Sequence, residues 1–152
     1  MRFDERSLRR EARRGATKLL SRMVDGATDA QVERRFSATL AQRALFSAMA
    51  RSYSAGVEPD FEGRLVYVLE RPETGQPAVR WTIHVHDGRA TAYEGGDSRP
   101  KLTVRFRLSD FVRIAAGELD AAQPLLTNRA SFEGDFALAA KLPEMFGAPR
   151  AY

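Results

Sequence analysis

Few residues in this chain are of the types that catalyse reactions or hold metal ions, and its two histidines are the first to consider. His84 and His86 lie two positions apart, so a β-strand would place both imidazoles on one face. Two such imidazoles can share a metal ion. Their expected neighbours on that face are Arg80 and Thr82, with no carboxylate beside them. We therefore predict a solvent-facing strand surface at the histidines and no metal site.

Other catalytic patterns are missing from the sequence. It has no Gly-x-Ser-x-Gly elbow, no Gly-x-x-x-x-Gly-Lys phosphate loop, no His-Glu-x-x-His helix and no cysteine. Gly95-Gly96 follows a strand pattern without a helix after it, which indicates a hairpin loop and not a phosphate cradle. Acidic pairs such as Glu58 with Asp60 fall in polar turns, where carboxylates are usually solvated. We predict no catalytic residue and no cofactor, and an enzyme built on the two histidines is the alternative.

The net charge of +4 is concentrated at the N-terminus. Residues 1–22 carry eight basic and three acidic side chains, a net of +5, whereas the other 130 residues carry a net of −1. The body of the chain therefore lacks the basic surface that a nucleic acid needs, and we predict no nucleic-acid partner. The basic segment predicts a helix that either faces an anionic membrane or simply packs on the domain. Its expected membrane-facing arginines are Arg6, Arg9, Arg10, Arg13 and Arg14.

Two helices are expected before the strands begin. An apolar stripe that includes Leu8, Leu19 and Met23 has spacings of three and four, which is typical of an amphipathic helix. A capping-box pattern over residues 28–31 then begins a long helix that runs towards Gly56. We expect this N-terminal helical segment to pack on the domain that follows.

From residue 63 the apolar period changes from about 3.6 to about 2, which indicates strands. Strands over residues 65–69, 79–86 and 89–94 should form an antiparallel meander, because turn sequences join them. The clearest alternation spans residues 102–108, and a short strand is expected over residues 130–133. These strands and the helices around them predict an α+β fold with helices covering one sheet face.

Residues that typically begin or end helices occur in the C-terminal third of the chain. Ser109 and Asp110 are expected to cap a short helix, after which Pro124 lies in a loop. Asp135 is expected to cap the last helix, and Pro143 to kink or end it near its last turn.

The C-terminal half of the sequence is rich in apolar side chains, and no catalytic motif accounts for them. We expect them to converge between the sheet and the C-terminal helices, as a packed core or as the wall of a ligand cavity. The candidates are Trp81, Ile83, Leu102, Val104, Phe106, Phe111, Ile114, Leu125, Leu126, Phe132, Phe136, Leu142, Met145 and Phe146.

Three ordered motifs resemble the sterol carrier protein 2 family over residues 61–147. They are Trp-Thr-Ile-His-Val-His-Asp-Gly at 81–88, Ser-Asp-Phe at 109–111 followed by Gly-Glu-Leu-Asp at 117–120, and Phe-Glu-Gly-Asp-Phe-Ala-Leu-Ala-Ala-Lys-Leu at 132–142. The last is the most specific. Asn128 stands where the family usually has a glycine, and asparagine tolerates the left-handed conformation.

The resemblance implies a five-stranded, mostly antiparallel sheet and an apolar tunnel for a sterol, fatty acid, fatty acyl-CoA or similar lipid, bound without covalent chemistry. In that arrangement the last helix would turn Phe136, Ala139, Ala140 and Leu142 towards the sheet. The expected organisation is an N-terminal helical segment over residues 1–56 and a lipid-binding domain over residues 57–152. The alternative function is an accessory module, similar to sterol-carrier-like proteins that assist quinone assembly, whose partners supply the chemistry.

The start of the chain lacks the apolar stretch of a signal peptide or membrane span. We therefore expect a cytoplasmic protein, with peripheral contact to an anionic membrane as a further expectation.

Overall fold

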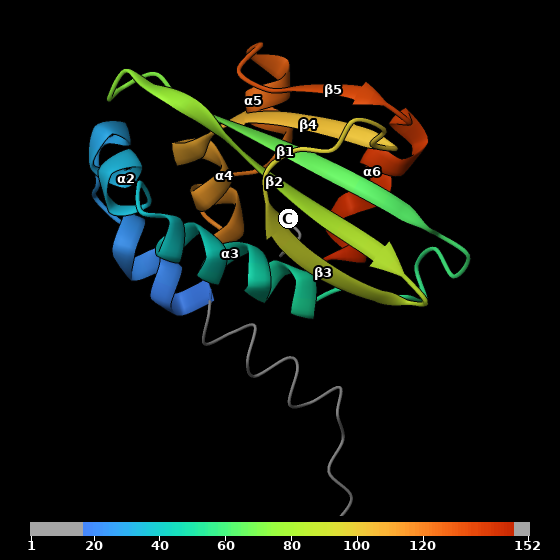
Figure 1. Ribbon diagram of the computed structural model, residues 1–152. Coiled ribbons are helices and arrows are strands. Elements are labelled where there is room, and N and C mark those ends of the chain that lie inside the picture. Colours follow the sequence, from blue (N-terminus) through green and yellow to red (C-terminus); the bar gives the residue numbers. More distant parts are fainter. Residues whose placement is uncertain (1–16, 148–152) are drawn as a thin grey trace, which may run out of the picture.

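The computed structural model describes residues 17–147. Residues 17–24 are helical and lead into the labelled elements of Figure 1. In chain order these are α2 (Asp29–Arg35), α3 (Thr39–Arg51), β1 (Gly63–Arg71), β2 (Gln76–His86), β3 (Arg89–Glu94), β4 (Leu102–Arg107), α4 (Leu108–Ala115), α5 (Ala122–Leu126), β5 (Ser131–Gly134) and α6 (Phe136–Met145).

The five strands form one mixed sheet in the order β3-β2-β1-β4-β5. Strands β1, β2 and β3 are the expected antiparallel meander, and β5 is antiparallel to β4. Asp87 and Gly88 make the β2–β3 turn with φ values of 51° and 72°, the left-handed conformations that a two-residue hairpin needs. The α+β fold, its five strands and the preceding helices are as predicted. The parallel pairing of β4 with β1 is the added finding.

This strand order forces one connection across the sheet. Because β3 lies at one edge and β4 lies beyond β1, residues 95–101 must cross β2 and β1 to begin β4. Figure 1 shows this crossing loop on the side of the sheet opposite the helices. Gly95 is therefore not in a hairpin, and the prediction of a hairpin loop at Gly95-Gly96 is wrong. Its N–H donates to the Arg80 carbonyl at 2.8 Å and its carbonyl accepts from Thr82 Oγ1 at 2.7 Å.

The central strand β1 is buried on both faces. Leu65, Tyr67 and Leu69 face the helices, whereas Val66 and Val68 point the other way and are covered by the crossing loop. A strand between two others, with a helix layer on one side and a loop on the other, can be apolar at nearly every position. Strand β1 therefore belongs to the core along most of its length.

The second of the two predicted N-terminal helices is divided into two helices in the structure. The capping box is present, because Thr28 Oγ1 accepts from the Gln31 N–H at 3.1 Å and the Gln31 side chain accepts from the Thr28 N–H. Helix α2 then ends at Arg35, and α3 begins at Thr39. Gln42 of α3 stabilises the break, since its side-chain Nε2 donates to the Phe36 carbonyl at 2.9 Å. The prediction of one continuous helix is wrong.

The N-terminal helices dock on the rest of the chain through partly buried polar contacts. Arg113 of α4 pairs with Asp29, the first residue of α2. The fully buried Glu33 carboxylate accepts from the N–H groups of Glu73 and Thr74 at 3.1 and 2.8 Å, in the β1–β2 turn. Such contacts fix where α2 lies against the sheet.

Two local predictions in the C-terminal third are also wrong. The N-cap of α4 is Arg107 and has no side-chain cap bond, so Ser109 and Asp110 lie inside the first turn and are buried. The segment around Pro124 is a short helix, α5. The Asp135 cap is confirmed, with Oδ1 accepting from the Leu138 N–H at 3.1 Å, and α6 ends two residues after Pro143.

Candidate functional site

An aromatic cluster fills the middle of the helix-facing side of the sheet. Phe46 of α3 is fully buried and stacks on Trp81 of β2, with ring centroids 5.2 Å apart and planes 7° from parallel. Its ring also stacks on Phe111 of α4 at 5.3 Å and 13°. Tyr67 of β1 meets Phe46 edge-on at 5.6 Å and 64°. The sheet, α3 and α4 therefore meet in one aromatic contact.

The apolar layer continues towards β4, β5 and α6. Phe106 lies 6.2 Å from Phe111 and 6.4 Å from Phe132, measured between ring centroids. Tyr53 and Phe146 pack at 5.5 Å near the end of α6. Aliphatic side chains from the same strands belong to the same cluster, so the layer extends from α3 to α6.

Most of the predicted binding residues belong to this layer. Eight are buried in it: Trp81, Ile83, Leu102, Val104, Phe106, Phe111, Met145 and Phe146. Ile114, Phe132 and Leu142 are partly buried and pack against it. Leu125 is of intermediate exposure.

Two predicted binding residues lie at the surface. Leu126 is 78% exposed at the end of α5, and Phe136 is 69% exposed at the start of α6. The buried face of α6 is made by Leu138, Ala139 and Met145, a pattern with helical spacing that leaves Phe136 on the opposite side. The expectation that Leu126 and Phe136 converge on the sheet is therefore wrong. Ala140 was also expected to face the sheet, and it is exposed.

Sequence reasoning missed Phe46 and Tyr67 as parts of this site. Phe46 comes from α3, whereas all the predicted binding residues belong to the C-terminal half of the chain. Tyr67 alternates with Leu65 and Leu69, and that alternation was the available signal for a strand facing the core.

Two polar atoms lie within the aromatic cluster. The Trp81 Nε1–H donates to Gln42 Oε1 at 3.0 Å, and both residues are buried. The Tyr67 hydroxyl is buried and has no hydrogen-bond partner among the described residues. Burial raises the pKa of Tyr67 well above its ordinary value, so the hydroxyl keeps its proton.

A charged cluster lies at the first turn of α4. The buried Asp110 carboxylate pairs through Oδ1 with Arg129, and its Oδ2 has no partner among residues 17–147. Burial raises the pKa of Asp110, although the positive charge of Arg129 opposes that shift. Asn128, next to Arg129, has a φ of 59°, as its left-handed prediction required. The cluster ties the segment after α5 to α4.

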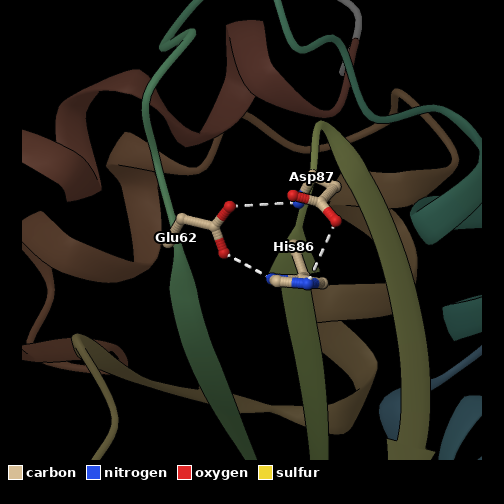
Figure 2. Close-up of side chains that lie close together, drawn as sticks. All are labelled: Glu62, His86 and Asp87. Carbon is tan, nitrogen blue, oxygen red and sulfur yellow. Dashed lines mark hydrogen bonds and ion pairs between the residues drawn. The ribbon is translucent and has the colours of Figure 1, made fainter.

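One of the two histidines, His86, does meet carboxylates, contrary to the sequence-based expectation. Figure 2 shows His86 between Glu62 and Asp87: its Nδ1 is 2.7 Å from Glu62 Oε2, and its Nε2 is 3.1 Å from Asp87 Oδ2. No local sequence pattern predicts the contact between Glu62 and His86, because it depends on the register between β1 and β2. Hydrogen bonding to Glu62 raises the pKa of His86, and the bonds from Asp87 N–H and His86 lower the pKa of Glu62.

This exposed trio has the geometry of an ion-paired imidazolium. The donor atoms lie within 4.8 Å of one another, but the two carboxylates approach opposite ring nitrogens. A doubly protonated ring satisfies both contacts, whereas a metal ion could bind only one of these nitrogens.

A hollow lies on the other face of the sheet, away from the aromatic cluster. It is an open groove of about 520 Å³ beside the crossing loop, floored by Val66 and Val68. Arg80, Arg105, Asp97 and Glu133 line it with balanced charge. Asp97 pairs with Arg64 at 3.3 Å, so this carboxylate already has a charged partner within the chain.

A family model described as the SCP-2 sterol transfer family matches residues 59–147, which is more than half of the chain. The chain belongs to the SCP-2 sterol transfer family. The matched region begins before β1 and ends after α6, so it contains the whole sheet and the C-terminal helices. No match was found among proteins of curated function.

Solved SCP-2 structures share the fold at low sequence identity. Palmitated SCP2L2 from Aedes aegypti is 19% identical, with a TM-score of 0.55 over 70% of this chain and 91% of that one. A Thermus thermophilus protein titled as possibly a sterol carrier protein is 17% identical, with a TM-score of 0.52 over 68% and 81% of the two chains. At such identities the likeness establishes the fold alone.

The same fold occurs as part of a larger enzyme. The stereoselective inverting sec-alkylsulfatase Pisa1 from Pseudomonas sp. is 16% identical, with a TM-score of 0.56 over 97% of this chain but only 29% of the enzyme. The fold therefore exists both alone and within a longer polypeptide.

Within residues 17–147, no helix is long and apolar enough to cross a membrane.

Proposed function

We propose that this SCP-2 family protein is a carrier that binds an apolar lipid, without covalent chemistry, between the sheet and helices α3, α4 and α6. The observation that carries this proposal is the continuous aromatic and aliphatic layer on the helix-facing side, together with family membership. Burying about ten methylene groups there would contribute about 8 kcal/mol of favourable transfer free energy, from which the entropic cost of association is subtracted.

The proposed lining is the predicted set without its two exposed members. It consists of Trp81, Ile83, Leu102, Val104, Phe106, Phe111, Ile114, Leu125, Phe132, Leu142, Met145 and Phe146, with Phe46 and Tyr67 added. Among the described residues these side chains bring no nucleophile and base together, which supports a carrier over an enzyme.

Native mass spectrometry of the gently purified protein, followed by titration with a fluorescent fatty acid, tests this function. We expect a co-purified or saturably bound lipid. The variant Leu142→Trp, in the partly buried face of α6, should fill the site and weaken binding. Phe136→Trp places the same indole on the exposed face of the same helix and should leave binding unchanged. Saturable binding by neither the wild type nor Phe136→Trp would refute the proposal.

We also propose that the N-terminal segment brings the carrier to anionic membranes. Arg6, Arg9, Arg10, Arg13 and Arg14 lie outside the described residues. The helical residues that follow support the idea, because Leu19 is 61% exposed beside the exposed Lys18 and Arg22. Leu19 thus does not pack on the core as its place in the apolar stripe predicted. Each basic residue near such a surface contributes about 1 kcal/mol.

Liposome sedimentation tests the membrane proposal. Replacing the five arginines with glutamine should release the protein from vesicles that contain phosphatidylserine, and added salt should do the same. Equal binding by the wild type and this variant at low salt would contradict the proposal.

A further inference from the structure

The Tyr67 hydroxyl is the starting point, because it is a hydrogen-bond donor buried among aromatic rings. Tyr67 is 2% exposed and lies in the middle of β1. Strands β2 and β4 flank β1 on both sides, so the backbone groups of this strand are committed to the sheet. Phe46 and Phe111 are the rings beside it, and neither offers a hydrogen-bond acceptor of ordinary strength. A buried hydroxyl without a partner is costly to the fold.

The neighbouring polar group shows that the fold can supply a partner. Trp81 pairs with Tyr67 across the β1–β2 register, and its N–H has a dedicated acceptor in Gln42. The amide nitrogen of Gln42 is satisfied in turn by the carbonyls of Phe36 and Ser37, at 2.9 and 3.3 Å. The same layer therefore satisfies one aromatic donor completely and leaves the adjacent one without a partner.

The other two unpartnered buried atoms have alternatives close by. Ser109 lies in the first turn of α4, where a serine hydroxyl can rotate towards a preceding backbone carbonyl. Asp110 already binds Arg129 through its other oxygen. The Tyr67 hydroxyl has no hydrogen-bond partner of either kind among residues 17–147, so an acceptor for it would come from outside them.

The charge of the surrounding layer limits what that acceptor can be. The buried polar and charged residues between 17 and 147 are Glu33, Gln42, Thr82, Ser109 and Asp110, and none of them is a cation. An ionised carboxylate beside Tyr67 would lose its hydration without gaining a counter-charge, which is strongly unfavourable. A neutral oxygen avoids that penalty and still accepts the hydrogen bond.

We propose that Tyr67 donates a hydrogen bond to a neutral oxygen of the bound lipid. The protein then selects apolar molecules that carry a hydroxyl, ketone or ester oxygen over plain hydrocarbons and over ionised fatty acids. This inference rests on the proposed function, since it assigns the ligand class of that same site.

Three ligands of one chain length provide the test: hexadecanol, hexadecane and palmitate, each competing with a bound fluorescent lipid at about pH 8, where palmitate is ionised. The wild type should bind hexadecanol roughly tenfold more tightly than hexadecane and more tightly than palmitate. In Tyr67→Phe the preference for hexadecanol over hexadecane should fall to about one. Tyr53→Phe removes a hydroxyl from another buried tyrosine, beside Phe146, and should keep the wild-type preference.

The outcomes separate this inference from the proposed function. If the wild type binds none of the three ligands and no fluorescent lipid, the carrier function itself fails. If all three bind but Tyr67→Phe keeps the wild-type ratio, the hydrogen bond from Tyr67 is refuted. Binding of palmitate as tight as that of hexadecanol at this pH also overturns the assignment to neutral oxygens. Circular dichroism of both variants should match the wild type, because each substitution removes a single oxygen atom.

Discussion

Phe46 is the side chain on which the contact between α3 and the sheet depends most. Its ring is fully buried and stacks on both Trp81 and Phe111, with Tyr67 at its edge. The substitution Phe46→Ala removes the ring from the centre of this cluster. Nearby side chains belong to strands with fixed register, so the space cannot collapse completely.

The expected cost follows from burial and ring geometry. Replacing a buried phenylalanine with alanine typically costs about 3–5 kcal/mol, through lost transfer free energy and the cavity that remains. Aromatic pairs add about 0.5–1.5 kcal/mol each, and Phe46 makes three. We therefore expect the upper part of that range, about 4–5 kcal/mol. That loss is a large fraction of the roughly 5–15 kcal/mol that stabilises a domain of this size.

Urea unfolding followed by tryptophan fluorescence measures this loss directly. Trp81 is the single tryptophan and is buried against Phe46, so its emission reports on the same contact. The matched control is Leu40→Ala on the same helix, because Leu40 is 75% exposed and should change the unfolding free energy by less than about 0.5 kcal/mol. If Phe46→Ala costs under about 1 kcal/mol, or no more than the control, α3 does not pack on the sheet as described.

Three further predictions concern polar groups. Tyr67→Phe should raise the unfolding free energy of lipid-free protein by about 1 kcal/mol, because it removes an unpartnered buried hydroxyl; a lower midpoint in urea would contradict this. Gln42→Leu should cost about 1–3 kcal/mol and alter Trp81 emission, because it leaves the Trp81 N–H unpaired, and unchanged emission and stability would count against that contact. Glu62→Gln should lower the pKa of His86 in an NMR titration, and an unmoved pKa would show that the pair does not form in solution. Because the pKa of His86 is raised, the stabilisation from His86 is lost as pH rises through the His86 pKa. Because the pKa of Glu62 is lowered, the stabilisation from Glu62 is lost as pH falls through the Glu62 pKa. The pair therefore stabilises the fold most at pH values between these two pKa values.

The sequence predicted those parts of the fold that local patterns determine. Alternation of apolar residues located the strands, and Asp87-Gly88 and Asp135 marked a turn and a cap that the structure confirms. These features depend on neighbouring residues, so a local pattern contains them. The unforeseen break between α2 and α3 depends instead on Gln42, whose side chain reaches back to the Phe36 carbonyl.

The candidate site was predictable in outline and not in detail. Alternation placed Trp81 and Val104 on the helix-facing side, where the structure buries them. Phe136 was misplaced because apolar character alone does not set the rotation of a helix against a sheet. The contact of Glu62 with His86 required the pairing of β1 with β2, which no local pattern gives.

The crossing loop also sets the order in which the sheet can assemble. Strand β4 pairs with β1 in parallel, Leu65 with Leu102, although the whole of β2 and β3 separates them in the chain. Two tight hairpins close the β1–β2–β3 meander cheaply, and the finished meander brings the start of residues 95–101 to within one short loop of β1. Folding should therefore proceed from the meander outwards, with β4, β5 and α6 added last. The part of the apolar layer that α6 contributes would then be the last to pack during folding.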